Sequence, residues 1–552
     1  MWQLIQKNKF ILLILLLATI VRFYKLGEIP AGLHRDEAFL GYNAFSILKT
    51  GRDMSGNFLP LHLKSFIYSP AGYSYFAVPS IAVFGLNPFS IRLPSALFGA
   101  LTVLLVYLLS QEFFKKSLST FYFPLFSSAL LALSPWHINL SRAATENIIV
   151  TFFLCLGVLL YMKWTKRSSL WLLMASFASF FITLSLYQAP RAFLPLFIPL
   201  LLFFWKPPPK NSPLPIILYV LSILLPLIVI LSVPNLSLRL RTVSLFADQK
   251  TQLNLDEYIR EDGVAGSNRF VTRLHHNKLI GYADQFSQNY FSHFSYPFLF
   301  TDQGLPGRYR VTGTGLLYLF ELPLLLAGLY WLISKGGQGG FVLLSWILLA
   351  PIGSSLAFDD VPNLQRTAIM LPALSMISVL GLMQLMNIIK TLRLRRFFVI
   401  ALFVFAIFNA SSYLHQYFVH QPIHKPWFRH EGYKELVVKV NALLPSYQKA
   451  IVTNRESAPA IFFLFFGKYD PVVYLKETAD KGIHDYDRAD FGPYEFSQEE
   501  CPLRIDSKTG SLTGKADTLY VNYGTCKDPT GTKLLEEIRR GDQSTVFRVV
   551  SL

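Results

Sequence analysis

Charged residues are scarce in this sequence of 552 residues. Asp, Glu, Lys and Arg make up 15% of it and hydrophobic residues 52%, whereas soluble globular domains carry about 25% charged residues. This shortage excludes a soluble enzyme of this size and predicts a membrane protein. The net charge is +17, but the basic residues separate hydrophobic runs instead of forming one patch, so we expect no nucleic-acid partner.

Cysteines and nucleotide-binding motifs are also rare or missing. Three cysteines form no disulfide framework or metal cluster. Cys155 lies in an apolar run and is expected in the core, whereas Cys501 and Cys526 would pair if their domain faces an oxidising compartment. The sequence has no internal repeat, P-loop or Rossmann fingerprint. Because no small-residue cleavage site follows the apolar run 10–21, we expect an uncleaved signal anchor.

Long hydrophobic runs are abundant. Crossing a bilayer takes about 20 apolar residues, and residues 70–86, broken by Pro70 and Pro79, are expected to form a juxtamembrane or re-entrant helix instead of a span. We therefore predict a mainly α-helical, polytopic transmembrane bundle of about 11–13 spans. The best candidates are 9–25, 92–110, 119–135, 146–162, 169–186, 190–205, 214–233, 314–333, 341–357, 367–389 and 397–414.

The charge pattern gives the bundle an orientation. Several short connections between the spans are basic, and the positive-inside rule places them and the N-terminus in the cytoplasm. The segments between them then face outward, chiefly the loops 26–69 and 234–313. The basic connections are at Lys7, Lys9, Lys115, Lys116, Lys163–Arg167, Lys206–Lys210, Lys335 and Lys390–Arg396.

The last part of the chain changes character. From about residue 420 hydrophobic runs shorten, and alternating patterns such as Val437–Val440 and Thr518–Val521 predict mixed helix and strand. We predict a transmembrane domain over 1–419 and a small extracytoplasmic α/β domain over 420–552.

Polar residues near the ends of the spans fall on the outward side. A carboxylate there can act as a general base on a hydroxyl or amine, and Arg or Lys can hold a phosphate. The sequence thus suggests an activated acceptor and a lipid-linked phosphate. The candidate residues are His34, Arg35, Asp36, Glu37, Lys64, Arg142, Glu146, Tyr187, Arg191, Lys278 and Arg366.

Each of these residues also has a structural interpretation. Asp36 and Glu37 could cap a helix or lie in a solvated loop, and Glu146 could simply begin a helix. Arg142 and Arg191 could be snorkelling interface residues. His275 and His276 lack a third ligand at a metal-like spacing. We therefore assign no metal ligands, and a divalent cation is left open as a cofactor.

An ordered set of motifs resembles a known family. Arg22-Phe23-Tyr24-Lys25, Asp36-Glu37-Ala38, Gly41-Tyr42-Asn43-Ala44, Thr50-Gly51-Arg52-Asp53, Arg92-Leu93-Pro94-Ser95-Ala96, Ser134-Pro135-Trp136-His137, Ser141-Arg142 with Glu146, and Tyr187 with Arg191 are similar to bacterial family 39 glycosyltransferases. These enzymes are relatives of the protein O-mannosyltransferases and of the aminoarabinose transferase that modifies lipid A. The resemblance covers residues 9–230 well and the later spans more loosely.

The resemblance implies a GT-C fold and a sugar donor linked to polyprenyl phosphate. By analogy, the enzyme inverts the anomeric carbon. Asp36 is then the general base, and Glu37 orients or binds the acceptor or sugar. The remaining candidate residues would bind substrate or the donor phosphate. The acceptor is left open as a glycan, lipid or protein, and membrane lipids surround the bundle.

Two positions depart from the aminoarabinose-transferase branch. That branch carries Asp-Glu-x-Arg-Tyr where Phe39 and Leu40 stand here, and Glu-Lys-Pro-Pro where this chain has Tyr68-Ser69-Pro70-Ala71. The phosphate-binding cations of those motifs are missing, so lipid A is not implied as the acceptor. The loop 234–313 is also too short for a β-trefoil domain, so protein mannosylation is not implied either.

Two other functional classes compete with a transferase. A transporter or flippase of lipid-linked sugars would fit the composition, but such proteins tend to show paired halves and broken helices at the midplane. The third possibility is an inactive relative that binds a partner at the cell envelope. The presence of both carboxylates favours the enzyme.

Overall fold

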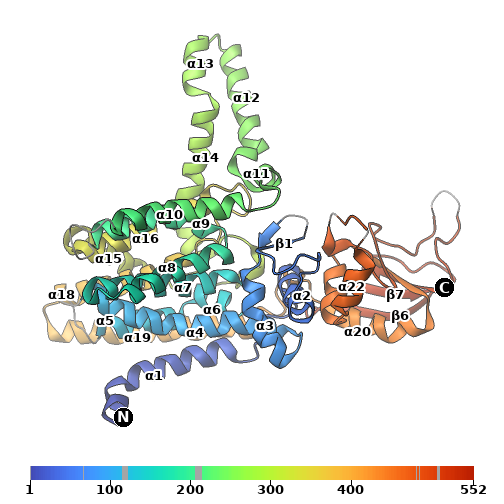
Figure 1. The fold of residues 1–552 in the computed structure, drawn as a ribbon, viewed down its shortest axis with the longest axis horizontal. Coiled ribbons are helices and arrows are strands. Elements are labelled where there is room, and N and C mark those ends of the chain that lie inside the picture. Colours follow the sequence, from blue (N-terminus) through green and yellow to red (C-terminus); the bar gives the residue numbers. More distant parts are fainter. Residues whose placement is uncertain are drawn as a thin grey trace. The chain divides into compact units, whose positions relative to one another are not determined.

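The protein is described from a computed structural model (Figure 1). The structure describes residues 2–65, 68–114, 122–205, 214–479, 481–483, 485–506 and 510–552. Contacts divide the chain into two compact units. The first unit comprises Met1–Ile20, Phe98–Leu140 and Asn147–Ser412, and the second comprises Val21–Leu97, Ser141–Glu146 and Tyr413–Leu552. The predicted basic connections at 115–116 and 206–210 lie outside the described residues.

Apolar helices make up most of the first unit. Among the described residues, five helices are long and apolar enough to cross a membrane, and five shorter apolar helices accompany them. Each of the eleven segments predicted as spans overlaps a helix. These helices are α1 (Trp2–Phe23), α4 (Pro88–Phe113), α5 (Tyr122–Leu133), α7 (Glu146–Arg167), α8 (Leu170–Leu186), α9 (Ala189–Phe204), α10 (Leu214–Leu231), α15 (Glu321–Lys335), α16 (Gly337–Leu349), α18 (Leu371–Ile388) and α19 (Leu392–His415).

Two glycines set the closest helix packing in this unit. A Cβ on Gly328 of α15 would collide with the carbonyl of Ile377, and one on Gly381 of α18 would collide with the carbonyl of Leu324. Small residues let two backbones approach closely inside a membrane. The pair therefore fixes α15 against α18.

The predicted span 314–333 begins too early. Residues 314–320 are not helical, and α15 starts at Glu321. The buried Gln303 Nε2 donates to the Thr314 carbonyl at 2.7 Å, and the Leu317 N–H donates to the Leu299 carbonyl at 2.8 Å. These contacts satisfy the backbone of this segment in an irregular conformation.

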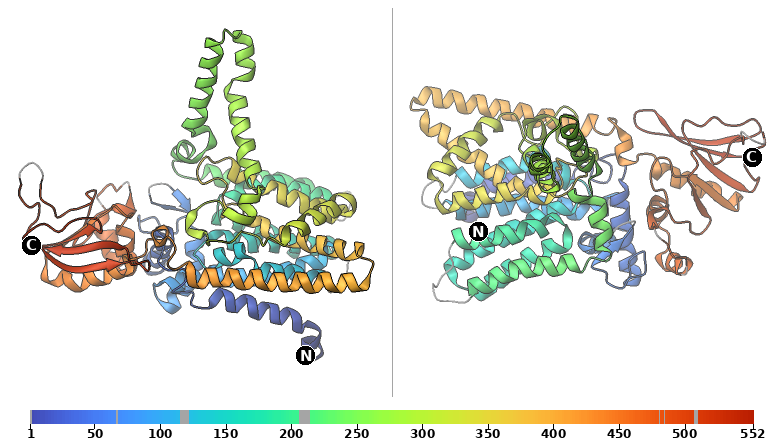
Figure 2. Two further views of the ribbon diagram at one scale, coloured as in Figure 1. Left: turned by 180° about the vertical axis from the view of Figure 1, so that it is seen from behind. Right: turned by 90° about the horizontal axis from the view of Figure 1, so that it is seen from above.

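A helical hairpin extends from the first unit. Figures 1 and 2 show that it runs across the direction of the apolar helices of the same unit. Short helices also belong to the first unit. The hairpin consists of α12 (Gln249–Val264), α13 (Arg269–His275) and α14 (Lys278–Ser292), and the short helices are α6 (Pro135–Ser141), α11 (Leu236–Val243) and α17 (Ile352–Ser355).

The second unit begins with α2 (Arg35–Thr50), a two-stranded sheet and α3 (Gly72–Phe84). His34 is the N-cap of α2, and Gly51, with φ of 70°, terminates it. The left-handed conformation at that position favours glycine. The strands are antiparallel: β1 (His62–Lys64) and β2 (Tyr68–Pro70). Helix α3 coincides with the segment expected to be juxtamembrane or re-entrant.

The C-terminal part of this unit contains a five-stranded sheet in the order β4-β3-β5-β7-β6. Strand β3 pairs in parallel with β4 and β5, whereas β7 is antiparallel to β5 and β6. The predicted mixture of helix and strand is confirmed: residues 518–521 lie in a strand and 437–440 in a helix. The elements are β3 (Lys449–Thr453), β4 (Tyr494–Ser497), β5 (Thr518–Tyr523), β6 (Lys533–Arg539), β7 (Thr545–Ser551), α20 (Tyr433–Leu443), α21 (Ala460–Phe466) and α22 (Pro471–Thr478).

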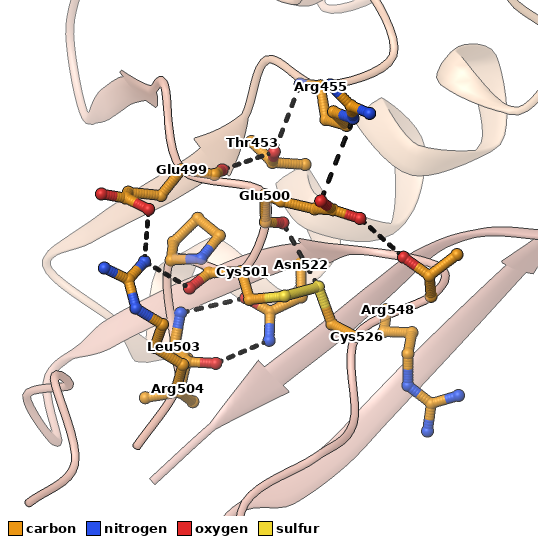
Figure 3. The surroundings of a disulfide bond; sticks show 12 residues. Thr453, Arg455, Glu499, Glu500, Cys501, Leu503, Arg504, Asn522, Cys526 and Arg548 are labelled. Atoms are coloured by element: carbon orange, nitrogen blue, oxygen red, sulfur yellow. Dashed lines mark hydrogen bonds and ion pairs between the residues drawn. A yellow bond between two sulfur atoms is a disulfide. The ribbon is translucent and has the colours of Figure 1, made fainter. Parts of the chain in front are cut away.

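A disulfide holds the loop beside this sheet. Cys501 and Cys526 are bonded, and Figure 3 shows Asn522 of β5 beneath the same loop. The Leu503 N–H donates to Asn522 Oδ1 at 3.0 Å, and Asn522 Nδ2 donates to the Leu503 carbonyl at 2.8 Å. Arg504 pairs with Glu499. The segment 499–504 is thus fixed by a covalent bond and by a buried amide. Cys155 is buried, as expected.

Candidate active site

Glu37, one of the two adjacent carboxylates, is buried in the first turn of α2. Arg92 Nε donates to Glu37 Oε1 at 3.0 Å, and Nη2 donates to Oε2 at 3.1 Å. The N–H groups of Ala144 and His34 also donate to the carboxylate, at 2.8 and 3.2 Å. Burial by itself raises the pKa of Glu37, but Arg92 and the two N–H groups outweigh it and hold the pKa below its usual value. We call this arrangement the Glu37–Arg92 clamp.

Arg92 also holds the loop that leads into α2. Nη1 donates to the carbonyls of Leu26 and Pro30 at 3.3 and 3.0 Å, and Nη2 donates to the Gly32 carbonyl at 2.7 Å. The buried guanidinium therefore uses all three nitrogens inside the protein. Because the loop and the first turn of α2 share one anchor, the backbone at Asp36 has a fixed position.

Arg92 was absent from the candidate residues predicted from the sequence. The available signal was its position at the start of an apolar run, since a charge at a membrane boundary usually has a partner or a function. The motif Arg92-Leu93-Pro94-Ser95-Ala96 is part of the resemblance, but nothing in it indicates that the partner is Glu37.

Asp36, the other carboxylate, points outward from the same turn. Half of its side chain (51%) is exposed, and its Oδ2 lies 3.3 Å from His34 Nδ1. Arg35 Nε lies 3.8 Å from Oδ1, and the Asp36 N–H donates to His34 Nδ1 at 3.2 Å. A carboxylate is favoured at a helix N-terminus. The cap predicted as an alternative therefore exists, but His34 and Glu37 form it, and Asp36 keeps an exposed carboxylate.

His34 packs against the C-terminal part of the second unit. Its ring centroid lies 4.8 Å from that of His430, and the His430 ring lies 5.6 Å from that of Phe462 in α21. The cap residue of α2 is thus held by side chains from the C-terminal part of the chain.

Arg142 is fully buried. Its Nη1 donates to the Val21 carbonyl at 2.7 Å, and Nη2 donates to the carbonyls of Tyr24 and Ile29 at 2.6 and 2.9 Å. The guanidinium also stacks over the Phe418 ring, at 4.8 Å. A snorkelling side chain is therefore wrong for Arg142. Its Nη groups bind backbone in this structure instead of facing a ligand.

The segment after Arg142 is tied to α4. Ser95 Oγ donates to the Thr145 carbonyl at 2.9 Å, and the Thr145 N–H lies 3.1 Å from the same oxygen. Glu146 follows as the first residue of α7 and is half-buried, in accordance with its interpretation as a helix start. The motifs Arg92–Ala96 and Ser141–Glu146 therefore meet, and both contact Glu37.

The motif Gly41-Tyr42-Asn43-Ala44 packs α2 against neighbouring elements. A Cβ on Gly41 would lie 2.5 Å from the Phe465 ring of α21. Asn43 Nδ2 donates to the Phe39 carbonyl at 2.9 Å, and its Oδ1 accepts the Met54 N–H at 3.0 Å. Tyr42 Oη donates to the Tyr469 carbonyl at 3.1 Å. This motif therefore packs α2 against neighbouring elements, and we assign its side chains no part in the reaction.

Lys64 lies in β1 of the same unit. Its Nζ donates to the Ile483 carbonyl at 3.2 Å and lies 5.4 Å from the centre of the Tyr486 ring. An ammonium has three N–H donors, so this cation has donor capacity beyond the carbonyl.

Tyr187 and Arg366 meet in the first unit. Arg366 donates to the Asp359 carbonyl at 2.8 Å and to Asp359 Oδ1 at 3.0 Å, and it forms a side-chain hydrogen bond with Tyr187. Burial lowers the pKa of Arg366, but Tyr187 and Asp359 outweigh it and raise the pKa. Arg191 is buried, and its Nε donates to the Leu184 carbonyl at 3.1 Å, which also excludes snorkelling there.

His293 organises the base of the hairpin near these residues. Its Nε2 accepts the Asn363 N–H at 3.1 Å and lies 2.9 Å from Ser354 Oγ. Nδ1 therefore carries the proton and donates to the Asn289 carbonyl at 2.7 Å. Burial lowers the pKa of His293 to about 4, so the ring is neutral near pH 7. This residue was not predicted.

Lys278 lies elsewhere in the first unit. It is the first residue of α14, at the opposite end of that helix from His293, and a helix of 15 residues is about 22 Å long. It is exposed near the hairpin tip and does not join Tyr187 and Arg366. His276 Nε2 lies 3.6 Å from Asp262 Oδ2. Within the described parts of the chain, no three His, Cys, Asp or Glu side chains are grouped as metal ligands, so we assign no metal-binding residues.

One protein family resembles part of the chain by sequence. Residues 69–233 match the sequence profile of the family described as dolichyl-phosphate-mannose-protein mannosyltransferase. The matched segment contains Arg92, Arg142, Glu146, Tyr187 and Arg191, whereas Asp36 and Glu37 precede it. No curated protein sequence matches the chain.

Solved structures share the fold. ArnT from Cupriavidus metallidurans, bound to undecaprenyl phosphate, is 12% identical with a TM-score of 0.53, and the match covers 98% of each chain. The oligosaccharyltransferase AglB from Archaeoglobus fulgidus, in complex with an inhibitory peptide and a dolichol-phosphate, is 13% identical with a TM-score of 0.50. That match covers 84% of this chain and 64% of AglB, so the chain spans somewhat less than two thirds of the archaeal enzyme. The predicted GT-C fold is confirmed.

Proposed function

We propose that this chain is a membrane glycosyltransferase of the GT-C type that transfers a sugar from a polyprenyl-phosphate carrier to an acceptor with inversion at the anomeric carbon. The observation that carries the proposal is the pair at the start of α2: Asp36 is exposed, while its neighbour Glu37 is locked to Arg92. The family match and the lipid phosphates bound by the two similar structures support the donor class.

Asp36 is the general base in this proposal. Its carboxylate takes the proton from the acceptor hydroxyl, and the acceptor oxygen forms a bond to the anomeric carbon. The bond from that carbon to the phosphate oxygen breaks on the opposite face, and its electron pair leaves with the polyprenyl phosphate. A fixed backbone at Asp36 keeps the base in one position relative to the acceptor. Holding the reacting groups in a productive geometry increases the rate.

Glu37 acts in this scheme as a positioning residue. Its two oxygens already accept four hydrogen bonds, and it is buried. An acceptor or sugar would have to displace Arg92 to reach it. We therefore assign its effect to the orientation of Asp36 and not to contact with the substrate.

The leaving phosphate needs cations. In the second unit, Arg35 lies beside Asp36 and Lys64 has free donor capacity, so we propose these two as phosphate ligands. In the first unit, the Nη groups of Arg366 bind Asp359, so we do not assign it to this phosphate. Arg142 is not proposed as a ligand because its Nη groups bind three carbonyls.

The charge pattern and the cysteines support a location for the reaction. We propose that the N-terminus is cytoplasmic and that the C-terminal domain, taken as 420–552, lies outside the cytoplasmic membrane. The disulfide between Cys501 and Cys526 supports an oxidising compartment for that domain.

The proposed function is tested with the variant Asp36→Asn and a lipid-linked sugar donor. Asn cannot accept the proton, so turnover should fall by about 10²- to 10⁴-fold, the usual contribution of a general base. Glu28→Gln is the matched control because Glu28 is an exposed carboxylate in the preceding loop. Formation of a glycosidic bond separates a transferase from a flippase, which would move labelled lipid without forming one.

A further inference from the structure

The tip of the helical hairpin combines exposed apolar side chains with positive charge. In residues 263–283 there is no Asp or Glu, but there are three cations, Arg269, Arg273 and Lys278. Val264 is 86% exposed, Phe270 75% and Leu279 81%. Side chains of this size rarely remain in water together without a partner.

The apolar and the basic residues lie on different faces of α13. Phe270 and Leu274 are four positions apart and share one face, and the exposed Val271 lies beside them. Arg269 and Arg273 are also four apart and share another face. None of the ion pairs among the described residues involves these two arginines, whereas the nearby acids Glu257 and Asp262 pair with Arg260 and His276. The tip is therefore amphipathic and carries net positive charge.

The base of the hairpin is attached to the end of a membrane span. Tyr290 Oη donates to the Leu348 carbonyl at 2.7 Å, and Asn289 Nδ2 donates to the carbonyls of Ser355 and Ala357 at 3.3 and 3.1 Å. Residues 337–355 are a candidate span. The hairpin runs across the direction of the apolar helices, as Figures 1 and 2 show, so it follows the membrane plane at that end of the span.

We propose that the hairpin tip, residues 264–280, docks on the membrane leaflet at this end of the bundle. The apolar side chains enter the boundary between headgroups and acyl chains, and the three cations bind anionic headgroups. Basic amphipathic helices lie in the interface in this way. Charge complementarity and the in-plane direction favour lipid over a protein partner. A docked hairpin would also stabilise the contact at its base, where His293 Nε2 accepts the Asn363 N–H.

Spin labels on the full-length protein in nanodiscs test this proposal. Cys155 is buried and the other two cysteines are bonded to each other, so an introduced cysteine is the accessible thiol. Labels at Phe270→Cys and Leu279→Cys are compared with Phe403→Cys, an exposed position in α19, and with Glu435→Cys, an exposed position in α20. The measurement is accessibility to oxygen, which concentrates in lipid, and to an aqueous nickel complex.

In nanodiscs that contain phosphatidylglycerol, the two tip labels should resemble the α19 label, with severalfold lower nickel accessibility than the α20 label. The triple variant Arg269→Gln, Arg273→Gln, Lys278→Gln should lower the docked-to-undocked ratio by roughly fivefold per charge, and phosphatidylcholine alone should have a similar effect. Tip labels as accessible to nickel as the α20 label in every lipid would overturn the proposal. The proposal would also be overturned if the tip labels stayed protected from nickel in detergent and showed spin–spin broadening. A second copy of the chain would then cover the tip.

Discussion

In the Glu37–Arg92 clamp, replacing Arg92 should destabilise the protein more than replacing Glu37. Arg92→Met leaves a buried carboxylate with two N–H donors and also deprives three loop carbonyls of their donor. Glu37→Gln leaves the guanidinium with those three carbonyls and keeps one side-chain acceptor. Removing one partner of a buried ion pair costs about 3–5 kcal/mol. We therefore expect a loss of about 5 kcal/mol in the free energy of unfolding for Arg92→Met and about 3 kcal/mol for Glu37→Gln.

Denaturant titration of the purified protein in detergent micelles measures these losses. The double variant should cost about 2 kcal/mol less than the sum of the two single variants, because no isolated charge remains in it. Glu28→Gln breaks the exposed Lys25–Glu28 pair and should change the stability by less than about 0.5 kcal/mol. The reasoning fails if Arg92→Met is as stable as the wild type, or if Glu37→Gln costs more than Arg92→Met.

Three further predictions concern stability. Gly41→Ala should lower the free energy of unfolding by about 1–3 kcal/mol because its Cβ would press on the buried Phe465 ring. Gly263→Ala, in an open part of α12, is the control. Equal melting temperatures for the two variants would contradict the packing described. The pKa of His293 is near 6.5 in the unfolded chain and about 4 in the folded protein, so the unfolded chain binds the proton first as the pH falls. The free energy of unfolding should therefore fall by up to roughly 3 kcal/mol between pH 6.5 and 4. His293→Gln should reduce this pH dependence, and an unchanged profile would be evidence against the neutral buried ring. Cys501→Ser with Cys526→Ser should lower stability by roughly 3 kcal/mol because it releases a loop with a sequence separation of 25; no change in chemical denaturation would mean that Asn522 alone fixes the loop.

The helices of the bundle were predictable because each depends on local composition. Runs such as 92–110 and 146–162 are apolar for the length of a span, and both are helices in the structure. The segment 314–320 has a similar composition but is irregular, because Gln303 binds its backbone. That partner comes from a neighbouring loop, and hydropathy contains no information about it.

The candidate site was predictable in part for the same reason. Asp36 and Glu37 stood out as adjacent charges after an apolar run, and the structure separates them into an exposed carboxylate and a buried one. Their different surroundings depend on Arg92, which is 55 positions from Glu37. Arg142 resembled a cation available to a phosphate, but its carbonyl partners lie more than 110 positions away. Pairings over such distances leave no periodicity in a single sequence.

The measurement that tests the central claim most directly is the turnover of Asp36→Asn with a polyprenyl-phosphate sugar, alongside Glu28→Gln and with folding checked by denaturant titration. The account predicts a loss of about 10²- to 10⁴-fold for Asp36→Asn, with donor binding retained and Glu28→Gln close to the wild type. A folded Asp36→Asn protein that forms the glycosidic bond at the wild-type rate would contradict the assignment of Asp36 as the base.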